Sequence, residues 1–214
     1  MAFESINFDY KLPKESINQN PYKNPNNSKL LIADTKEIIK FKEFNKIINS
    51  PSLFIMNKST VRNVRIQSKK KTEGTIEIFI LQILGNNIAK CLIRSTDRKV
   101  LNKKYELENF EFKIIKIENN TFHIHTNLAI NEIIDKYGKT PLPPYIEDNS
   151  KKYKYYNNQF SSGGFSVASP TAGLHFTNKQ IKNLKKLGHD FVYINLDVNV
   201  DTFKPVTSKF LEDH

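Results

Sequence analysis

The chain has 214 residues, and its 33 Lys and Arg against 22 Asp and Glu give a formal net charge of +11 and a pI of about 9.5. Hydrophobic residues make up 38% of the chain, which excludes wholesale disorder, and no apolar run is long enough to span a bilayer. The charge favours polyanions such as RNA, unless an AT-rich genome that enriches Lys codons explains it. We therefore expect a globular cytoplasmic protein with no targeting signal and no membrane partner.

The first sixty residues predict a hairpin, a helix and a strand. Two β-rich runs around a polar centre predict the hairpin over 30–41, and apolar residues at helical spacing predict a short helix over 44–48. The run LFIM (53–56) is apolar without alternation, so we expect a strand that is covered on both faces.

Residues 61–126 contain short β-rich runs about ten residues apart, which is typical of a small antiparallel barrel. Lys69–Lys71 are expected at a solvated hairpin tip, and the single cysteine, Cys91, is expected in the core, without a disulfide or a metal role. His123 and His125 share a strand face, where they either bind a metal or, as their spacing more often means, are solvated.

The chain after the barrel predicts a return to the first domain. A helix is expected over 128–138, ending at Gly138, and the Pro-rich stretch 141–146 then forms a connector. The sequence KKYKYYNN (151–158) is either a solvated helix face or a surface where tyrosines stack on bases and lysines meet phosphates.

The last third predicts a β-loop-α-β unit. FSVA (165–168) reads as a strand, Thr177 and Gln180 form a capping box for a helix that ends at Gly188, and FVYINL (191–196) reads as a buried strand. The loop PTAGLHF then lies at the carboxyl end of a strand, where open α/β sheets bind ligands. If the strands pair in parallel, 57–60 and 197–203 converge on the same cleft.

These elements predict the α/β fold class. We expect a mixed or parallel-sheet α/β domain, made of 1–60 and 140–214, that is interrupted by an inserted small antiparallel β-barrel with a trailing helix at 61–139. The sequence does not specify an oligomeric state.

One segment, FSVASPTAGLHFT (165–177), resembles the long signature of the S-adenosylmethionine:tRNA ribosyltransferase-isomerases, the enzymes of tRNA queuosine biosynthesis. The resemblance to the N-terminal part of that family continues along the chain in family order. The further matching segments are NFDYKLP (7–13), MNKSTVRNVRI (56–66), GTIEIFI (74–80), PLPPYI (141–146), DTFKPV (201–206) and LEDH (211–214).

The resemblance implies an enzyme that transfers the ribosyl moiety of S-adenosylmethionine to 7-aminomethyl-7-deazaguanine in tRNA and isomerises it to epoxyqueuosine. Adenine and methionine are released, S-adenosylmethionine is the ribosyl donor, and no metal is required. The chemistry needs a proton acceptor beside the sulfonium and a proton donor for adenine, so His175 is the candidate catalytic residue. The candidate substrate-binding residues are Asn57, Arg65, Glu77, Pro170, Thr171, Ala172, Gly173, Leu174, Thr202 and Phe203.

The chain also departs from the family pattern. Pro25 and Lys29 stand where the family has arginine, and Ser59-Thr60 lacks the arginine of the family's Asn-x-Thr-Arg motif. Segment 197–203 (DVNVDTF) has lost a histidine and two glycines, and family members continue beyond this chain. These departures keep a second hypothesis open: a truncated, catalytically inactive relative that retains at most tRNA binding, or a chain whose partner supplies the rest.

Overall fold

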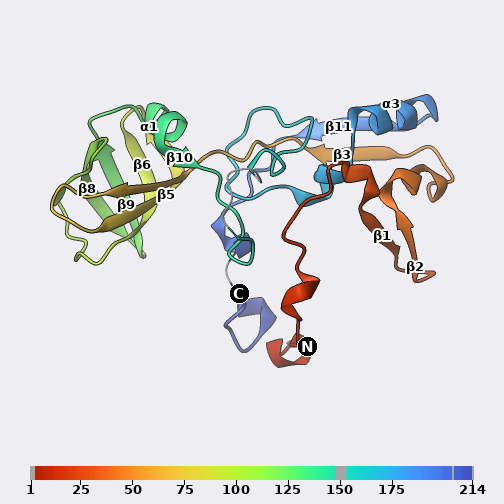
Figure 1. Ribbon diagram of the computed structural model, residues 1–214, viewed down its shortest axis with the longest axis horizontal. Coiled ribbons are helices and arrows are strands. Elements are labelled where there is room, and N and C mark those ends of the chain that lie inside the picture. The colour runs from red at the N-terminus through yellow and green to blue at the C-terminus, as the bar shows by residue number, and fades with distance from the viewer. Residues whose placement is uncertain (1–2, 148–152, 204, 214) are drawn as a thin grey trace.

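The structure is a computed structural model that describes residues 3–147, 153–203 and 205–213. Figure 1 shows a curled antiparallel sheet on one side and a smaller assembly around β3, β11 and α3 on the other. The two terminal segments lie side by side, because Ser5 N donates to Lys209 O at 2.9 Å. None of the helices in the described ranges has the length and apolar character needed to cross a membrane.

The predicted N-terminal hairpin is confirmed. Strands β1 (Lys29–Ile32) and β2 (Glu37–Lys40) pair antiparallel. The helix expected at 44–48 is wrong: a 3-10 helix, η4, covers Phe41–Lys46 instead. Phe41 and Phe44 stack with ring centroids 5.2 Å apart, and residues three apart eclipse each other in a 3-10 helix, so this aromatic pair favours the tighter turn.

The second region is one seven-stranded antiparallel sheet in the order β10-β4-β5-β6-β9-β8-β7. The predicted succession of strands between 61 and 126 is confirmed. The strands of this sheet are β4 (Arg65–Lys69), β5 (Thr75–Gly85), β6 (Ile88–Arg94), β7 (Lys104–Glu106), β8 (Glu111–Glu118), β9 (Thr121–Thr126) and β10 (Gly138–Lys139).

The sheet curls so that the end of β4, the strand beside β10, meets the end of β7. Beyond β4, Lys70 forms a bridge to Leu107 beyond β7, and Glu108 N donates to Lys69 O at 3.1 Å. Cys91 lies in the core as expected, and burial raises the pKa of its thiol. The solvated position expected for Lys70 is wrong, because its ammonium lies 2.7 Å from the Asp97 carboxylate and its side chain is only 7% exposed.

Helix α1 (Ile130–Tyr137) packs three isoleucines against the curled sheet. Gly138 follows it as predicted, but the reason is different. Its φ of −76° is not left-handed, so no special turn requires glycine. A Cβ at this position would collide with the carbonyl oxygens of Asn63 and Ile134, so Gly138 lets β10 approach closely.

The third region pairs β3 (Leu53–Asn57) in parallel with β11 (Asp190–Ile194), with helix α3 (Asn178–Lys186) directly before β11. The prediction of both strands is confirmed. The buried position expected for β11 is wrong, because Val192 is 46% and Ile194 is 42% exposed. The strand expected at 165–168 is wrong, because that segment contributes one bridge, from Ser166 to Val61. The complete cover expected for β3 is also wrong, since Leu53 is 59% and Ile55 is 65% exposed.

Phenylalanines hold α3 and β3 together. Phe41, Phe176, Met56 and Leu184 form the centre of this second core, and Phe54 packs against it. Thr177 caps α3 by accepting from Gln180 N at 3.2 Å. The reciprocal half of the expected capping box is absent among these residues: Gln180 Oε1 accepts no hydrogen bond, while Gln180 Nε2 donates to Phe41 O at 2.9 Å.

The molecule therefore contains mixed parallel and antiparallel sheets, few helices and one curled antiparallel sheet. The remaining short elements are 3-10 helices. They are η1 (Ser5–Phe8), η2 (Lys14–Ser16), η3 (Pro25–Asn27), η5 (Thr171–His175), η6 (Val200–Phe203) and η7 (Leu211–Asp213).

Candidate active site

The loop with the sequence PTAGLH separates two cavities. Its first half lines a cavity of about 610 Å³, which we call the aromatic cavity. Its second half, Leu174 and His175, lines a cavity of about 600 Å³, which we call the lysine–tyrosine cavity. The aromatic cavity is lined by Phe41, Phe44, Phe54, Ile55, Met56, Asn57, Ser169, Pro170, Thr171, Ala172, Gly173 and Phe176. The lysine–tyrosine cavity is lined by Asn18, Pro21, Tyr22, Lys23, Pro25, Ser28, Lys154, Tyr155, Asn157, Asn158, Gln159, Leu174 and His175.

A tight turn gives this loop its shape. Gly173 N donates to Pro170 O at 3.1 Å, and Phe176 N donates to Gly173 O at 3.2 Å. Gly173 is buried, and a Cβ there would lie 3.0 Å from both Asn158 Nδ2 and the Phe160 ring. Glycine therefore lets the loop pack directly on the 158–160 segment, which brings the two cavities close together.

His175 is half-buried at the boundary between the cavities. Its ring lies 5.4 Å from that of Phe41, which lines the aromatic cavity. Burial lowers the pKa of His175, and a hydrogen bond to the Pro25 carbonyl opposes that shift only in part. The lowered pKa favours the neutral imidazole, in which one nitrogen donates to Pro25 and the other can accept a hydrogen bond.

Asn57 joins the end of β3 to the segment that follows β11. Its amide donates to Leu196 O at 2.7 Å and accepts from Leu196 N at 3.1 Å and Ser59 N at 3.0 Å. Both ends of the side chain are therefore engaged inside the protein. Asn57 shapes the rim of the aromatic cavity, and its amide is already satisfied there.

The carboxylate of Asp197, a residue that departs from the family pattern, accepts hydrogen bonds within a polar network. It accepts from Ser59 Oγ at 2.5 Å and from Phe165 N at 2.8 Å. The Ser59 hydroxyl also lies 2.8 Å from that of Ser166. Asp197 therefore ties the 57–60 and 165–166 segments together. The convergence of 57–60 and 197–203 on the cleft of the PTAGLHF loop is present only in part, because the described residues of 197–203 line neither cavity beside that loop.

A glycine makes room for this network. Gly164 has φ of +73°, and a Cβ built on it would lie 2.7 Å from Asp197 Oδ1 and would collide with Ser59 Oγ. The pattern Ser-Ser-Gly-Gly (161–164) was a signal for this feature, since paired glycines mark positive φ and close approach.

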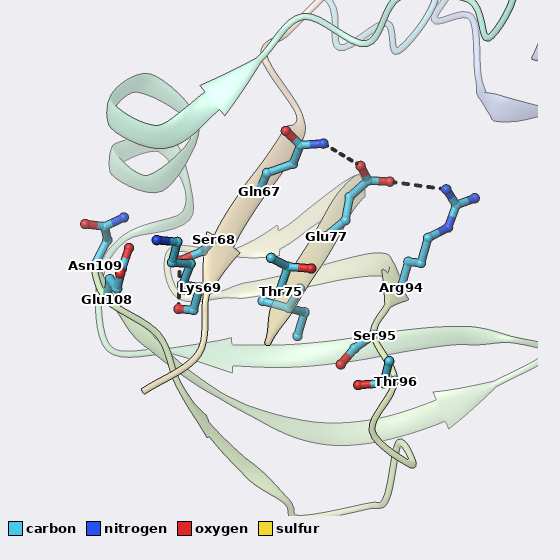
Figure 2. Close-up of a pocket in the computed structure, with 11 residues that line it drawn as sticks. Gln67, Ser68, Lys69, Thr75, Glu77, Arg94, Ser95, Thr96, Glu108 and Asn109 are labelled. Atoms are coloured by element: carbon cyan, nitrogen blue, oxygen red, sulfur yellow. Dashed lines mark hydrogen bonds and ion pairs between the residues drawn. The ribbon is translucent and has the colours of Figure 1, made fainter. Parts of the chain in front are cut away.

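Arg65 and Glu77 form a separate site on the curled sheet. Arg65 Nε donates to Glu77 Oε2 at 2.8 Å, Gln67 donates to the same oxygen at 3.0 Å, and Arg94 lies 4.0 Å away. Burial raises the pKa of Glu77, but these donors and charges outweigh it, so the pKa lies below its usual value. Figure 2 shows the Glu77 carboxylate between Gln67 and Arg94 at a cavity of about 790 Å³.

Glu77 also lines a second cavity of about 470 Å³, and Arg65 lines this cavity with it. Val200 of η6 lines it as well, together with Pro141 and Pro144 of the connector. The backbone of Thr202 and Phe203 belongs to η6. Thr202 is exposed, and the side chain of Phe203 lies outside the described residues.

The predicted site residues thus fall into two groups. Pro170–Leu174, His175 and Asn57 surround the loop between the two cavities, whereas Arg65 and Glu77 belong to the curled sheet. Sequence reasoning missed Tyr22 and Lys23, which line the lysine–tyrosine cavity. The signal for them was an aromatic and a cation between two prolines in PYKNP (21–25).

The described residues contain no group of three or more His, Cys, Asp or Glu that is arranged to hold a metal ion. His123, one half of the alternative metal pair, lies 3.5 Å from the Glu118 carboxylate. His125 is exposed on the same strand.

Comparison with known proteins identifies the family. The family model described as "Queuosine biosynthesis protein" matches residues 5–214. A relative from Sulfurihydrogenibium sp., named S-adenosylmethionine:tRNA ribosyltransferase-isomerase, is 35% identical over 97% of this chain and 64% of its own length. A relative of the same name from Nitrosomonas europaea is 31% identical over 100% of this chain and 63% of its own.

The chain therefore belongs to the queuosine biosynthesis protein family. It spans less than two thirds of the length of these relatives. Among solved structures, a crystal structure of the Thermotoga maritima S-adenosylmethionine tRNA ribosyltransferase is 25% identical and has a TM-score of 0.36. That likeness covers 89% of this chain and 58% of the other.

Proposed function

We propose that this chain provides the catalytic loop of an S-adenosylmethionine:tRNA ribosyltransferase-isomerase. The reaction would transfer the ribosyl moiety of S-adenosylmethionine to 7-aminomethyl-7-deazaguanine in tRNA and release adenine and methionine. The observation that carries the proposal is the loop with the sequence PTAGLH, which borders a cavity on each side. Its His175 lines the lysine–tyrosine cavity, and the His175 ring lies 5.4 Å from that of Phe41 in the aromatic cavity. Two substrates can then approach one proton-transfer group.

The aromatic cavity suits S-adenosylmethionine. Its lining contains four phenylalanines and, within the described chain, no charged side chain. Aromatic faces attract flat purines by stacking and cationic groups such as a sulfonium by their quadrupole. Pro170, Thr171, Ala172 and Gly173 would contact the substrate mainly through the backbone, as the resemblance implies.

His175 is our candidate for proton transfer. With one nitrogen fixed by Pro25, the other would accept a proton from the carbon beside the sulfonium and return it to the departing adenine. Leu174, Thr202 and Phe203 remain proposed substrate contacts. Arg65 and Glu77 are proposed tRNA contacts, with the Arg65 guanidinium meeting phosphate.

Adenine release tests this function. Purified chain would be incubated with S-adenosylmethionine and tRNA that carries 7-aminomethyl-7-deazaguanine, and adenine would be quantified by chromatography. We expect release from the wild type, a loss of about 10²-fold or more in His175→Gln, and no loss in the exposed His125→Gln control. Release equal to that of a protein-free blank would refute catalysis by this chain and leave the second hypothesis, an inactive relative that retains tRNA binding.

We propose in addition that the reaction takes place in the cytoplasm and requires no metal. If no metal is required, a chelator would leave adenine release unchanged. We also propose two domains, one made of 1–60 and 140–214 and the other of 61–139. The support is that β3 pairs with β11, although the curled sheet lies between them in the sequence. Limited proteolysis tests this division. Cuts near 60 and 140 support it, and early cuts within the curled sheet argue against it.

A further inference from the structure

We propose that the lysine–tyrosine cavity binds a single unpaired nucleotide of RNA, with the base stacked on a tyrosine and the phosphates at Lys23 and Lys154. The inference rests on the proposed function, because it names the part of the RNA that enters beside His175. The sequence alone left KKYKYYNN open between a solvated face and a base-stacking surface. Its Lys151 and Lys152 lie outside the described residues.

Charge selects the ligand of this cavity. Lys23 and Lys154 line it, and none of its described lining residues is acidic. In the described part of the chain neither lysine is paired with a carboxylate. Two unpaired cations favour an anion, so they favour a phosphate over S-adenosylmethionine, whose sulfonium and amine are cationic.

Two tyrosines supply a surface for a base. Tyr22 is 46% and Tyr155 is 37% exposed, and both line the cavity. Lys154 Nζ lies over the Tyr155 ring, 4.9 Å from its centre, so a cation is held against one face of that ring. Aromatic rings with adjacent cations are the recurring way in which proteins bind single-stranded nucleic acid.

The amide side chains in the wall of this cavity form hydrogen bonds within the protein. The Asn157 side chain accepts from Val61 N at 2.8 Å, Asn158 donates to Asn57 O at 3.3 Å, and Gln159 accepts from Asn178 N at 2.9 Å. These amides fix the wall beneath the tyrosines, so a nucleotide would meet a preformed surface. The cavity volume of about 600 Å³ lies in the range of small-ligand sites, about 300–1,000 Å³.

RNA binding by the full chain tests the inference. The probes are a fluorescent stem-loop RNA with an unpaired loop and a fully paired RNA of equal length, and dissociation constants are measured over a salt series. We expect tighter binding of the stem-loop. Tyr155→Leu would weaken it about tenfold, whereas Tyr155→Phe, which keeps the ring, would bind like the wild type. The paired RNA would not distinguish the two variants.

Charge is tested with a matched pair of variants. Lys23→Gln/Lys154→Gln would reduce the slope of log affinity against log salt by about 1.4, the value for two single-strand phosphates. The control Lys179→Gln/Lys182→Gln removes two exposed charges from α3 and would leave the slope close to that of the wild type. Because all four lysines and Tyr155 are at the surface, thermal unfolding should be the same in every variant.

Three results would overturn the inference: equal binding by Tyr155→Leu and Tyr155→Phe, equal slopes for the two double variants, or no preference for the stem-loop. The adenine of S-adenosylmethionine is the other base that could stack on Tyr155, and calorimetry with S-adenosylmethionine tests for it. If Tyr155→Leu lost S-adenosylmethionine binding but kept RNA binding, the inference would also be refuted. Failure of the proposed function looks different. The wild type would then release no adenine while the variants still ranked as expected in RNA binding.

Discussion

In the curled sheet, Ile76, Ile78 and Ile80 of β5 are at most 2% exposed, whereas in the β3–β11 pair Leu53 and Ile55 are 59% and 65% exposed. Both regions are rich in apolar strand residues, but only the curled sheet closes on itself and gives those residues a common interior. The β3–β11 pair has phenylalanines and α3 on one face and an open apolar face on the other. An apolar run in the sequence therefore predicts a strand, but it does not predict whether other residues of the described chain bury both faces of that strand.

The largest expected effect is a loss of packing in the curled sheet. Phe112 is 2% exposed, and its ring stacks on Tyr105 at 4.7 Å. We expect Phe112→Ala to lower the free energy of unfolding by about 3–5 kcal/mol, because it removes buried area and leaves a cavity. Urea unfolding followed by circular dichroism measures this. A loss below about 1 kcal/mol would mean that the two regions are packed alike.

The next effect concerns the network between the regions. Gly164→Ala combines a positive φ with a collision at Ser59, whereas Gly163→Ala has φ of +70° but no atom closer than 3.6 Å to its new Cβ. We expect a loss of about 2–4 kcal/mol for Gly164→Ala and about 1 kcal/mol for Gly163→Ala. Equal losses in urea unfolding would show that Asp197 and Ser59 move aside freely.

A smaller, pH-dependent effect is expected at Glu77. Its pKa is lowered in the folded protein, so the stabilisation is present above the ordinary value of 4.5 and is lost as the pH falls through the folded pKa. Glu77→Gln should cost about 1–2 kcal/mol at pH 7 and reduce the loss of stability in acid. Melting temperatures from pH 7 downward, with the exposed Glu108→Gln as control, test this. An unchanged pH profile in Glu77→Gln would contradict it.

The smallest effect is expected on the open face. Ile55→Thr and Val192→Thr change residues that are 65% and 46% exposed and lie opposite each other in the strand register. We expect each to change the free energy of unfolding by no more than about 0.5 kcal/mol. Losses above about 1.5 kcal/mol would show that this face is covered in solution, for instance by a second copy of the chain, which light scattering would detect.

Alternation and turn residues were enough to predict the strands of the curled sheet, and continuous apolar runs predicted β3 and β11 themselves. The pairing of β3 with β11 was not predicted, because the partner expected for β11 was the segment 165–168. They did not predict η4, because Phe41 and Phe44 both pack on Phe176, which is distant in sequence, and such tertiary contacts decide between helix types. Lys70 was misjudged for a similar reason, since its counter-charge, Asp97, is distant in sequence. The loop with the sequence PTAGLH could be identified from sequence. That it borders two cavities could not, because Tyr22 and Phe41 come from elsewhere in the chain.

Hydrogen bonds join the two ends of the 61–162 stretch, so residues can be added within it without moving those ends. Thr60 N donates to Gly163 O at 2.9 Å, and Ser162 N donates to Lys58 O at 2.8 Å. These two bonds hold the beginning and the end of the stretch next to each other. The entropy of closing a loop grows only slowly with its length. Residues added at a hairpin tip such as Asn119 and Asn120 would therefore leave both cavities in position, which makes the curled sheet a natural place to graft new sequence.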